Sequence, residues 1–156
     1  MLYSEEQRRR RDASPWTLVQ GVLAPLQFAV FLVSLLLVWR ALASGEGAAL
    51  ATASVVAKTL VLYAIMITGA IWERDVFGQF LFARPFFWED VVSMLVLALH
   101  TAYLVAVFAD LLPLAQQLYL ALLAYAAYVI NAAQFLLKFR LARRQTAGGE
   151  SMAVRP

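Results

Sequence analysis

The chain has 156 residues, of which 63% are hydrophobic and 15% are charged. Soluble chains contain about 45–50% apolar and about 25% charged residues, and a domain of this size cannot bury such an apolar excess. The composition therefore argues against a soluble enzyme and a disordered scaffold. The net charge of +3 is too small to indicate nucleic acid by itself, and the absence of cysteine excludes disulfides, thiolate metal sites and cysteine nucleophiles.

Four long stretches of the chain are almost free of charge. They lie between Asp12 and Arg40, Glu46 and Glu73 (with Lys58 inside), Asp90 and Asp110, and Asp110 and Lys138. Because about 20 helical residues cross the hydrocarbon core of a bilayer, these stretches predict an all-α integral membrane bundle. We expect one domain over 1–144, with transmembrane helices at residues 16–43, 48–72, 89–109 and 114–139. A disordered tail is expected over 145–156, which contains glycine and a terminal proline.

The positive charges predict how the chain is oriented in the membrane. One group precedes the first helix, a second lies between the second and third, and a third follows the last: Arg8–Arg11; Arg74 and Arg84; Lys138, Arg140, Arg143, Arg144 and Arg155. On the opposite side there is only Arg40. Since positive charge stays on the cytoplasmic side, both termini and the middle loop of this multi-pass protein are expected in the cytoplasm. The basic residues then reflect topology, with no pattern that indicates nucleic acid.

The loop between the second and third helices is rich in aromatic residues. Residues 73–88 contain Phe77, Phe80, Phe82, Phe86, Phe87 and Trp88, and carboxylates flank them at both ends. One explanation is an aromatic belt at the level of the lipid headgroups. The other is an aromatic-lined mouth that admits a large, amphipathic ligand from the inner face of the membrane.

Polar side chains inside the predicted spans recur at helical spacing. They form one face of each helix: Gln20, Gln27 and Ser34; Glu89, Ser93 and His100; Tyr128, Asn131 and Lys138. Lys58 lies near the middle of the second helix. Interhelical hydrogen bonds can explain the amides, and an ion pair or snorkelling can explain Lys58. His100 fits an interhelical hydrogen bond, a metal ligand or a proton relay.

One histidine also limits the chemistry. A bis-histidine haem site needs two histidines, and a membrane zinc protease needs more ligands than the chain offers. The sequence contains no phosphate-binding loop, dinucleotide fingerprint or serine elbow. Taken alone, the residues predict a four-helix membrane protein with a polar, aromatic cytoplasmic half.

Several long segments carry a resemblance to a known family. They are TLVQGVLAPLQFAVFLVS at 17–34, KTLVLYAIMITGAIWERDVFGQFLFA at 58–83, FFWEDVVSMLVLALHTAYL at 86–104 and YAAYVINAAQFLLKFR at 125–140. Together they resemble the 3-vinyl bacteriochlorophyllide hydratase family, called 2-vinyl in older nomenclature, over about residues 3–144. The resemblance implies a hydro-lyase that adds water to the C3-vinyl group of chlorophyllide a and forms the 1-hydroxyethyl derivative in bacteriochlorophyll a biosynthesis.

The implied reaction suggests roles for particular residues. Protonation of the terminal vinyl carbon leaves a cation beside the ring, and water then attacks the inner carbon. Glu73 and Glu89 are candidate proton donors, since burial can keep a carboxylic acid protonated. Asp90 and Asp75 are candidates to pair with nearby arginines or to hold the water. His100 is a candidate base, or an axial ligand to the magnesium of the substrate.

The remaining candidates would bind the macrocycle. Asn131 and Gln27 could orient the water or the keto group of the ring, and Lys58 or Lys138 could pair with the propionate. The aromatic loop, including Trp88, would pack on the ring faces. No cofactor is expected, because magnesium enters as part of the substrate. The expected partners are chlorophyllide a, the lipid bilayer of the cytoplasmic or intracytoplasmic membrane and neighbouring biosynthetic enzymes.

Two other functions remain as alternatives. The first is a non-catalytic tetrapyrrole carrier or assembly factor that uses the same slot. The second is a small four-helix transporter, which is disfavoured because the first helix lacks the acidic residue that proton coupling requires.

Overall fold

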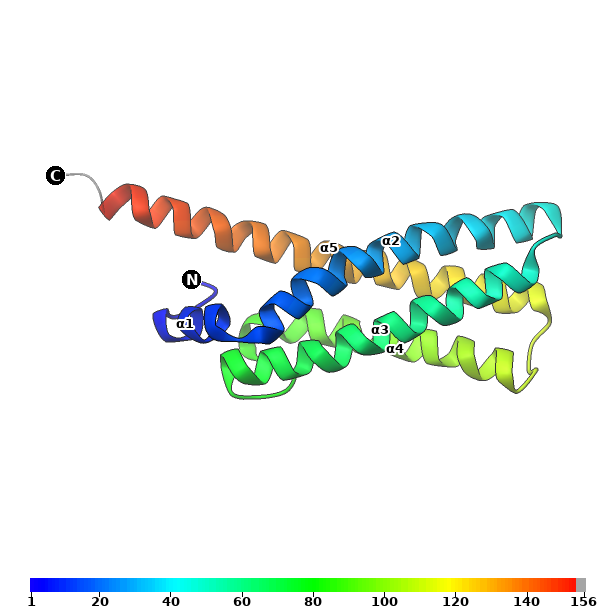
Figure 1. The fold of residues 1–156 in the computed structure, drawn as a ribbon, viewed down its shortest axis with the longest axis horizontal. Coiled ribbons are helices and arrows are strands. Elements are labelled where there is room, and N and C mark those ends of the chain that lie inside the picture. Colours follow the sequence, from blue (N-terminus) through cyan, green and yellow to red (C-terminus); the bar gives the residue numbers. More distant parts are fainter. Residues whose placement is uncertain (154–156) are drawn as a thin grey trace.

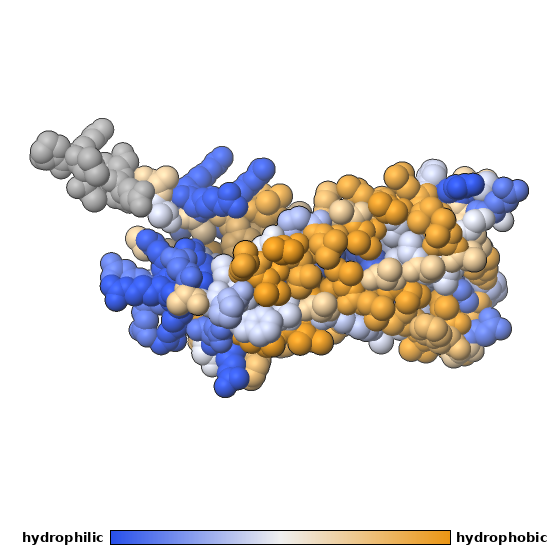
Figure 2. Space-filling model, viewed as in Figure 1, coloured by the Kyte–Doolittle hydropathy of each residue, from blue (hydrophilic) through white to orange (hydrophobic). Residues whose placement is uncertain are grey.

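A computed structural model describes residues 1–153, with side chains through residue 148. The described chain is all-helical, in the order α1 (Glu5–Ala13), α2 (Pro15–Ser44), α3 (Ala48–Phe77), the short 3-10 helix η1 (Arg84–Phe86), α4 (Phe87–Phe108) and α5 (Leu114–Ala153). Four of these helices are long and apolar enough to cross a membrane, which confirms the prediction of an all-helical chain with four candidate spans. Figure 2 shows hydrophobic side chains along most of the bundle and hydrophilic ones gathered near its ends.

The bundle consists of two antiparallel hairpins. α2 packs along α3, and α4 packs along α5; α2 also contacts α5, and α3 contacts α4. The N-terminus, the end of α5 and the α3–α4 connection lie at one end, here called the terminal end (Figure 1). The short α2–α3 and α4–α5 turns lie at the other end, here called the hairpin end (Figure 1). This arrangement brings the end of α3 beside the start of α4.

Local sequence explains where the helices begin and end. Ser4 and Gln7 form a reciprocal capping box at the start of α1, a helix that the hydrophobic pattern did not predict. Gly45 and Gly78 end α2 and α3 with φ values of 72° and 83°, which glycine adopts without steric cost.

The helix boundaries differ from the predicted ones most clearly at two places. α3 continues past the predicted residue 72 to Phe77, so Glu73 lies inside the helix rather than in a loop. α5 continues past residue 139 to Ala153, so the described part of the segment 145–156 is helical rather than disordered. Residues 154–156 lie outside the described residues. The far part of α5 projects beyond the other helices at the terminal end (Figure 1).

Most of the core is apolar, with polar groups enclosed in it. Its main cluster includes Phe31, Val38, Val55, Tyr103 and Tyr125. Lys58, Thr59 and His100 are also buried. Such groups are costly within a bilayer unless they find partners.

Candidate functional site

Three buried acidic residues meet at the terminal end of the bundle. Glu73 comes from the last turns of α3, and Glu89 and Asp90 come from the first turn of α4. These three residues retain only 4–6% exposure. They lie close together because α3 and α4 are consecutive, packed helices joined by a short connection.

Glu73 and Asp90 form a carboxyl pair. Their carboxyl groups lie close enough for their charges to interact. Two ionised carboxylates enclosed this closely repel each other, which favours the state in which one of the two is protonated. The pair is therefore suited to keep one transferable proton in a place that is nearly closed to solvent.

Two consecutive backbone amides support the carboxyl pair. The Phe82 N–H donates to Asp90 Oδ2 at 2.8 Å, and the Ala83 N–H donates to Glu73 Oε1 at 2.6 Å. Phe82 has a φ of 60°, a left-handed conformation that costs about 1–2 kcal/mol for a residue with a Cβ. This conformation is part of the loop geometry that places both N–H groups on the carboxyls.

Glu89 has a different environment. Lys138 Nζ of α5 lies 2.8 and 2.9 Å from the two Glu89 carboxylate oxygens, and it also donates to the Pro85 carbonyl. A carboxylate held by an ammonium group on both oxygens is stabilised in its charged form. Glu89 is therefore the counter-ion of Lys138, while the neighbouring Asp90 carries the pair with Glu73.

An amide network fixes the first turn of α4 to α5. Asn131 Nδ2 donates to the Glu89 carbonyl at 2.9 Å, and the Ser93 hydroxyl lies 3.0 Å from Asn131 Oδ1. Gln134 accepts a weaker hydrogen bond from Asn131 at 3.4 Å. These contacts occupy the Asn131 amide with the protein and place Glu89 and Asp90 at a fixed height on α4.

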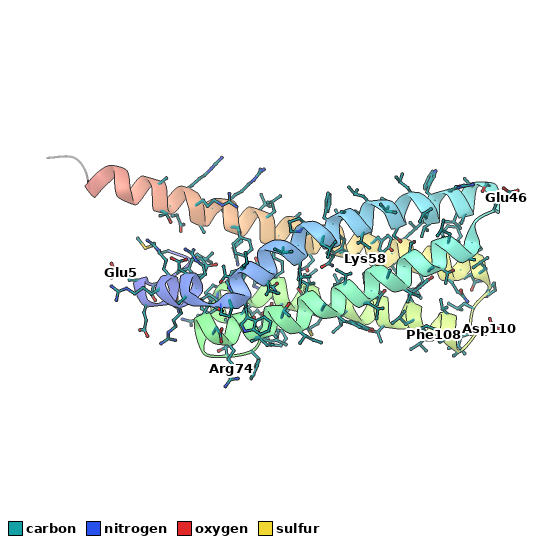
Figure 3. The ribbon with its side chains drawn as sticks, viewed as in Figure 1. Glu5, Glu46, Lys58, Arg74, Phe108 and Asp110 are labelled. Carbon is teal, nitrogen blue, oxygen red and sulfur yellow. The ribbon has the colours of Figure 1, made fainter. Side chains whose placement is uncertain are left out.

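The structure separates the predicted site residues into two groups. Lys58 and His100 lie in the middle of the bundle, away from the acids, and Figure 3 shows Lys58 about halfway along its length. Ten residues of α4 separate Asp90 from His100, which corresponds to about 15 Å. Lys58 Nζ lies 3.6 Å from the centre of the Tyr128 ring.

A hydrogen-bonded chain crosses the middle of the bundle close to these two residues. The Tyr125 hydroxyl lies 2.5 Å from Ser34 Oγ, which lies 2.8 Å from Ser54 Oγ. The chain connects α5, α2 and α3, and it confirms that Ser34 serves in interhelical hydrogen bonding. The sequence patterns did not single out Tyr125 or Ser54; the three-residue spacing of Tyr125 from Tyr128 was the available signal.

Three other residues proposed from the sequence, Trp88, Gln27 and Asp75, lie outside both of these groups. Trp88 is 68% exposed on the outside of the bundle. Gln27 is buried in α2, one turn before Phe31, which packs on Tyr125. Asp75, which was expected to pair with an arginine or to hold the water, accepts a hydrogen bond from Ser14 Oγ at 2.7 Å.

An aromatic cluster lies under α1 at the terminal end. Tyr3 stacks on Phe77 at 5.9 Å, and Phe86 packs against Trp72 and Phe135. Burial in this cluster raises the pKa of the Tyr3 hydroxyl to about 12. The contribution of Tyr3 could not be inferred from the pattern, because it precedes the first apolar run.

Comparisons with known proteins agree closely with one another. A family profile described as 2-vinyl bacteriochlorophyllide hydratase matches residues 3–141. A protein of that name from Rhodobacter capsulatus is 62% identical over 150 residues, covering 96% of this chain and 87% of the relative. Another from Cereibacter sphaeroides is 66% identical over 142 residues, covering 91% and 88%. No solved structure gave a significant match.

Proposed function

The chain belongs to the 2-vinyl bacteriochlorophyllide hydratase family, and from this premise we propose that it adds water to the C3-vinyl group of chlorophyllide a, a step of bacteriochlorophyll biosynthesis. The product is the 3-(1-hydroxyethyl) derivative, so the enzyme is a carbon–oxygen hydro-lyase. The relatives' shared name carries this assignment, and the four apolar helices suit a flat, membrane-seeking substrate.

We assign proton donation to the Glu73–Asp90 pair. Hydration begins when the terminal vinyl carbon takes a proton and the inner carbon becomes a cation that the ring delocalises. Repulsion between two enclosed carboxylates favours keeping one proton on the pair, and a positioned acid of this kind contributes about 10²–10⁴ in rate. Of the acids proposed from the sequence, Glu73 and Asp90 therefore fit the donor role best.

The same pair can also close the catalytic cycle. After the proton leaves, both carboxyls are charged, and the repulsion between them favours return of a proton to the pair. Water attacks the inner carbon through its oxygen, and the proton that it loses returns to the pair. The vinyl group gains one proton and one hydroxyl, and the pair ends the cycle with the one proton with which it began.

Glu89 and Lys138 serve as positioning residues in this proposal. Their ion pair ties α4 to α5 and to the Pro85 carbonyl directly beside Asp90. Asn131 and Ser93 hold the Glu89 backbone. Because Glu89 is paired with Lys138, the proton donor in this proposal is the Glu73–Asp90 pair and not Glu89.

We assign no chemical step to His100. Its side chain is fully enclosed in the packed middle of the bundle, about 15 Å along α4 from Asp90. A macrocycle whose vinyl group met the carboxyl pair would place its magnesium beside His100 only if the four helices separated. Lys58, equally buried, is likewise a poor partner for the propionate of that macrocycle.

The proposed reaction also has consequences for cofactors, membrane orientation and substrate delivery. The reaction moves a proton and a water molecule without electron transfer, so no cofactor beyond the substrate's own magnesium is required. The excess of positive charge at the terminal end supports its placement on the cytoplasmic side of the cytoplasmic or intracytoplasmic membrane. The aromatic side chains of the α3–α4 connection would then meet the substrate, with other biosynthetic enzymes able to deliver it from that side.

The test is turnover of chlorophyllide a by the purified protein in detergent. Loss of the vinyl group shortens the conjugated system, so the red absorption band should move to shorter wavelength. The product should be heavier by one water, with its oxygen derived from labelled solvent water. Bound pigment with an unshifted band and no water adduct would instead identify a carrier and overturn the proposal.

A further inference from the structure

The middle of the bundle contains polar groups that the proposed chemistry does not use. Lys58 Nζ and His100 Nε2 are fully buried and have no hydrogen-bond partner among the described residues. The Tyr103 hydroxyl is also buried and has no hydrogen-bond partner among the described residues. In a bilayer, each polar group left without a partner costs several kcal/mol.

Lys58 and His100 both lie near a single aromatic ring, that of Tyr125. Lys58 Nζ lies 5.6 Å from the centre of the Tyr125 ring, and the His100 ring centre lies 5.8 Å from it. Lys58 is close enough to His100 for their charges to interact. The orphaned groups therefore share one region of the interior, with Lys58 supplied by α3 and His100 by α4.

The hydrogen-bonding roles of the two nitrogens differ. His100 Nδ1 lies 2.8 Å from the Val96 carbonyl, which can only accept, so Nδ1 carries the proton. In the neutral ring, Nε2 is then an acceptor. Lys58 Nζ can donate up to three hydrogen bonds. It contacts the face of the Tyr128 ring, which offers no oxygen or nitrogen atom as an acceptor.

We propose that this region is an internal water-binding site, in which water accepts a hydrogen bond from Lys58 Nζ and donates one to His100 Nε2. A carboxylate would suit Lys58 but has no proton for the Nε2 lone pair, whereas water satisfies both groups at once. Buried waters occupy polar sites that offer two or more partners. The Tyr103 hydroxyl and the Lys58 amine supply further donors for additional waters.

Radiolytic hydroxyl labelling tests the proposal without substrate or turnover, so its outcome is independent of the hydratase assignment. Bound water generates radicals in place, so His100 and Tyr128 should be oxidised although they are buried. Rates are normalised to those of the unfolded chain, and the comparison residue is Phe86, which is 1% exposed in an apolar cluster. We expect His100 and Tyr128 to be labelled at least about threefold faster than Phe86.

A pair of matched variants on α3 locates the water. Lys58→Met removes the donor and should reduce labelling of Tyr128 and His100 to the Phe86 level. Leu62→Met, one turn away and also buried, should leave the labelling unchanged. His100→Leu removes the acceptor and should lower Tyr128 labelling if Lys58→Met fails to fold. Wild-type rates equal to that of Phe86, or rates insensitive to the loss of Lys58 or His100, would overturn the proposal.

Discussion

At the scale of single residues, Glu73 and Asp90 are distinguished from the other acids by their surroundings. Each is buried, each accepts a hydrogen bond from a backbone N–H of the α3–α4 connection, and the two carboxyls are close enough for their charges to interact. Glu89, only one residue away from Asp90, is instead held by Lys138. Sequence position alone could not assign different roles to Glu89 and Asp90. The groups that contact each carboxyl do distinguish them.

Replacing either member of the carboxyl pair by its amide should abolish proton donation. We expect Glu73→Gln and Asp90→Asn each to lower kcat by about 10²–10⁴, the usual contribution of a general acid. Each amide can still bond to the remaining carboxyl and fill the same volume, so chlorophyllide binding should change little. Single-turnover absorbance measurements give kcat, and pigment titration gives the affinity.

The matched control for these variants is Asp75→Asn. Asp75 lies two residues from Glu73 on α3 but is exposed and bonded to Ser14. Its loss should leave kcat within about twofold of the wild type, as surface changes away from a site usually do. Wild-type turnover in both Glu73→Gln and Asp90→Asn would remove the pair from the mechanism.

Residue spacing predicted some of the site but not its pairings. The four- and seven-residue intervals placed Glu89, Ser93 and His100 on one face of a helix, and all three are buried. The pairing of Glu73 with Asp90 depends on a loop backbone that folds back between two helices. The pairing of Glu89 with Lys138 depends on the height of α5 beside α4. Neither quantity is encoded in local spacing.

At the scale of elements, the connection between α3 and α4 carries a conformational cost. Phe82 adopts a φ of 60° while its N–H donates to Asp90. Strain of this kind persists only where surrounding contacts enforce it. In this structure the two carboxyls and the helix ends of α3 and α4 provide that enforcement.

The strain can be measured with two substitutions at Phe82. Phe82→Asn and Phe82→Val both remove the ring, but asparagine tolerates the left-handed region and a β-branched residue does not. We expect the valine variant to be less stable than the asparagine variant by about 1–2 kcal/mol. Apparent Tm values in detergent, recorded at one heating rate, should differ by several degrees. Equal Tm values would show that the loop relaxes out of this conformation.

Hydrophobicity predicted the positions of the membrane-spanning helices, but it did not predict their polar ends or the polar helix α1. Apolar runs placed all four spanning helices, since a helix satisfies its backbone hydrogen bonds within its own segment in a lipid environment. The runs did not show that α3 continues through Glu73 to Phe77, because charged residues end a hydrophobic run without ending a helix. They also missed α1, whose start depends on the Ser4–Gln7 capping box rather than on periodicity.

At the scale of the whole molecule, the charges are distributed unequally between the two ends of the bundle. The arginines of α1 and of the far part of α5 lie at the terminal end, whereas the hairpin end carries Arg40 with the acids Glu46 and Asp110. Figure 3 shows Glu46 and Asp110 at one end and Glu5 and Arg74 at the other. This asymmetry lets the orientation in the membrane be tested directly.

The absence of native cysteine makes single-cysteine labelling a clean test of orientation. Glu5→Cys and Gln79→Cys place an exposed thiol at the terminal end, and Glu46→Cys places one at the hairpin end. Because positive charge is retained in the cytoplasm, a membrane-impermeant maleimide should label Glu46→Cys in intact cells. The other two variants should react only after the membrane is permeabilised. The reverse pattern would place the carboxyl pair on the outer side, away from a substrate delivered from the cytoplasm. Labelling of only one of the variants Glu5→Cys and Gln79→Cys in intact cells would contradict the four-span topology itself.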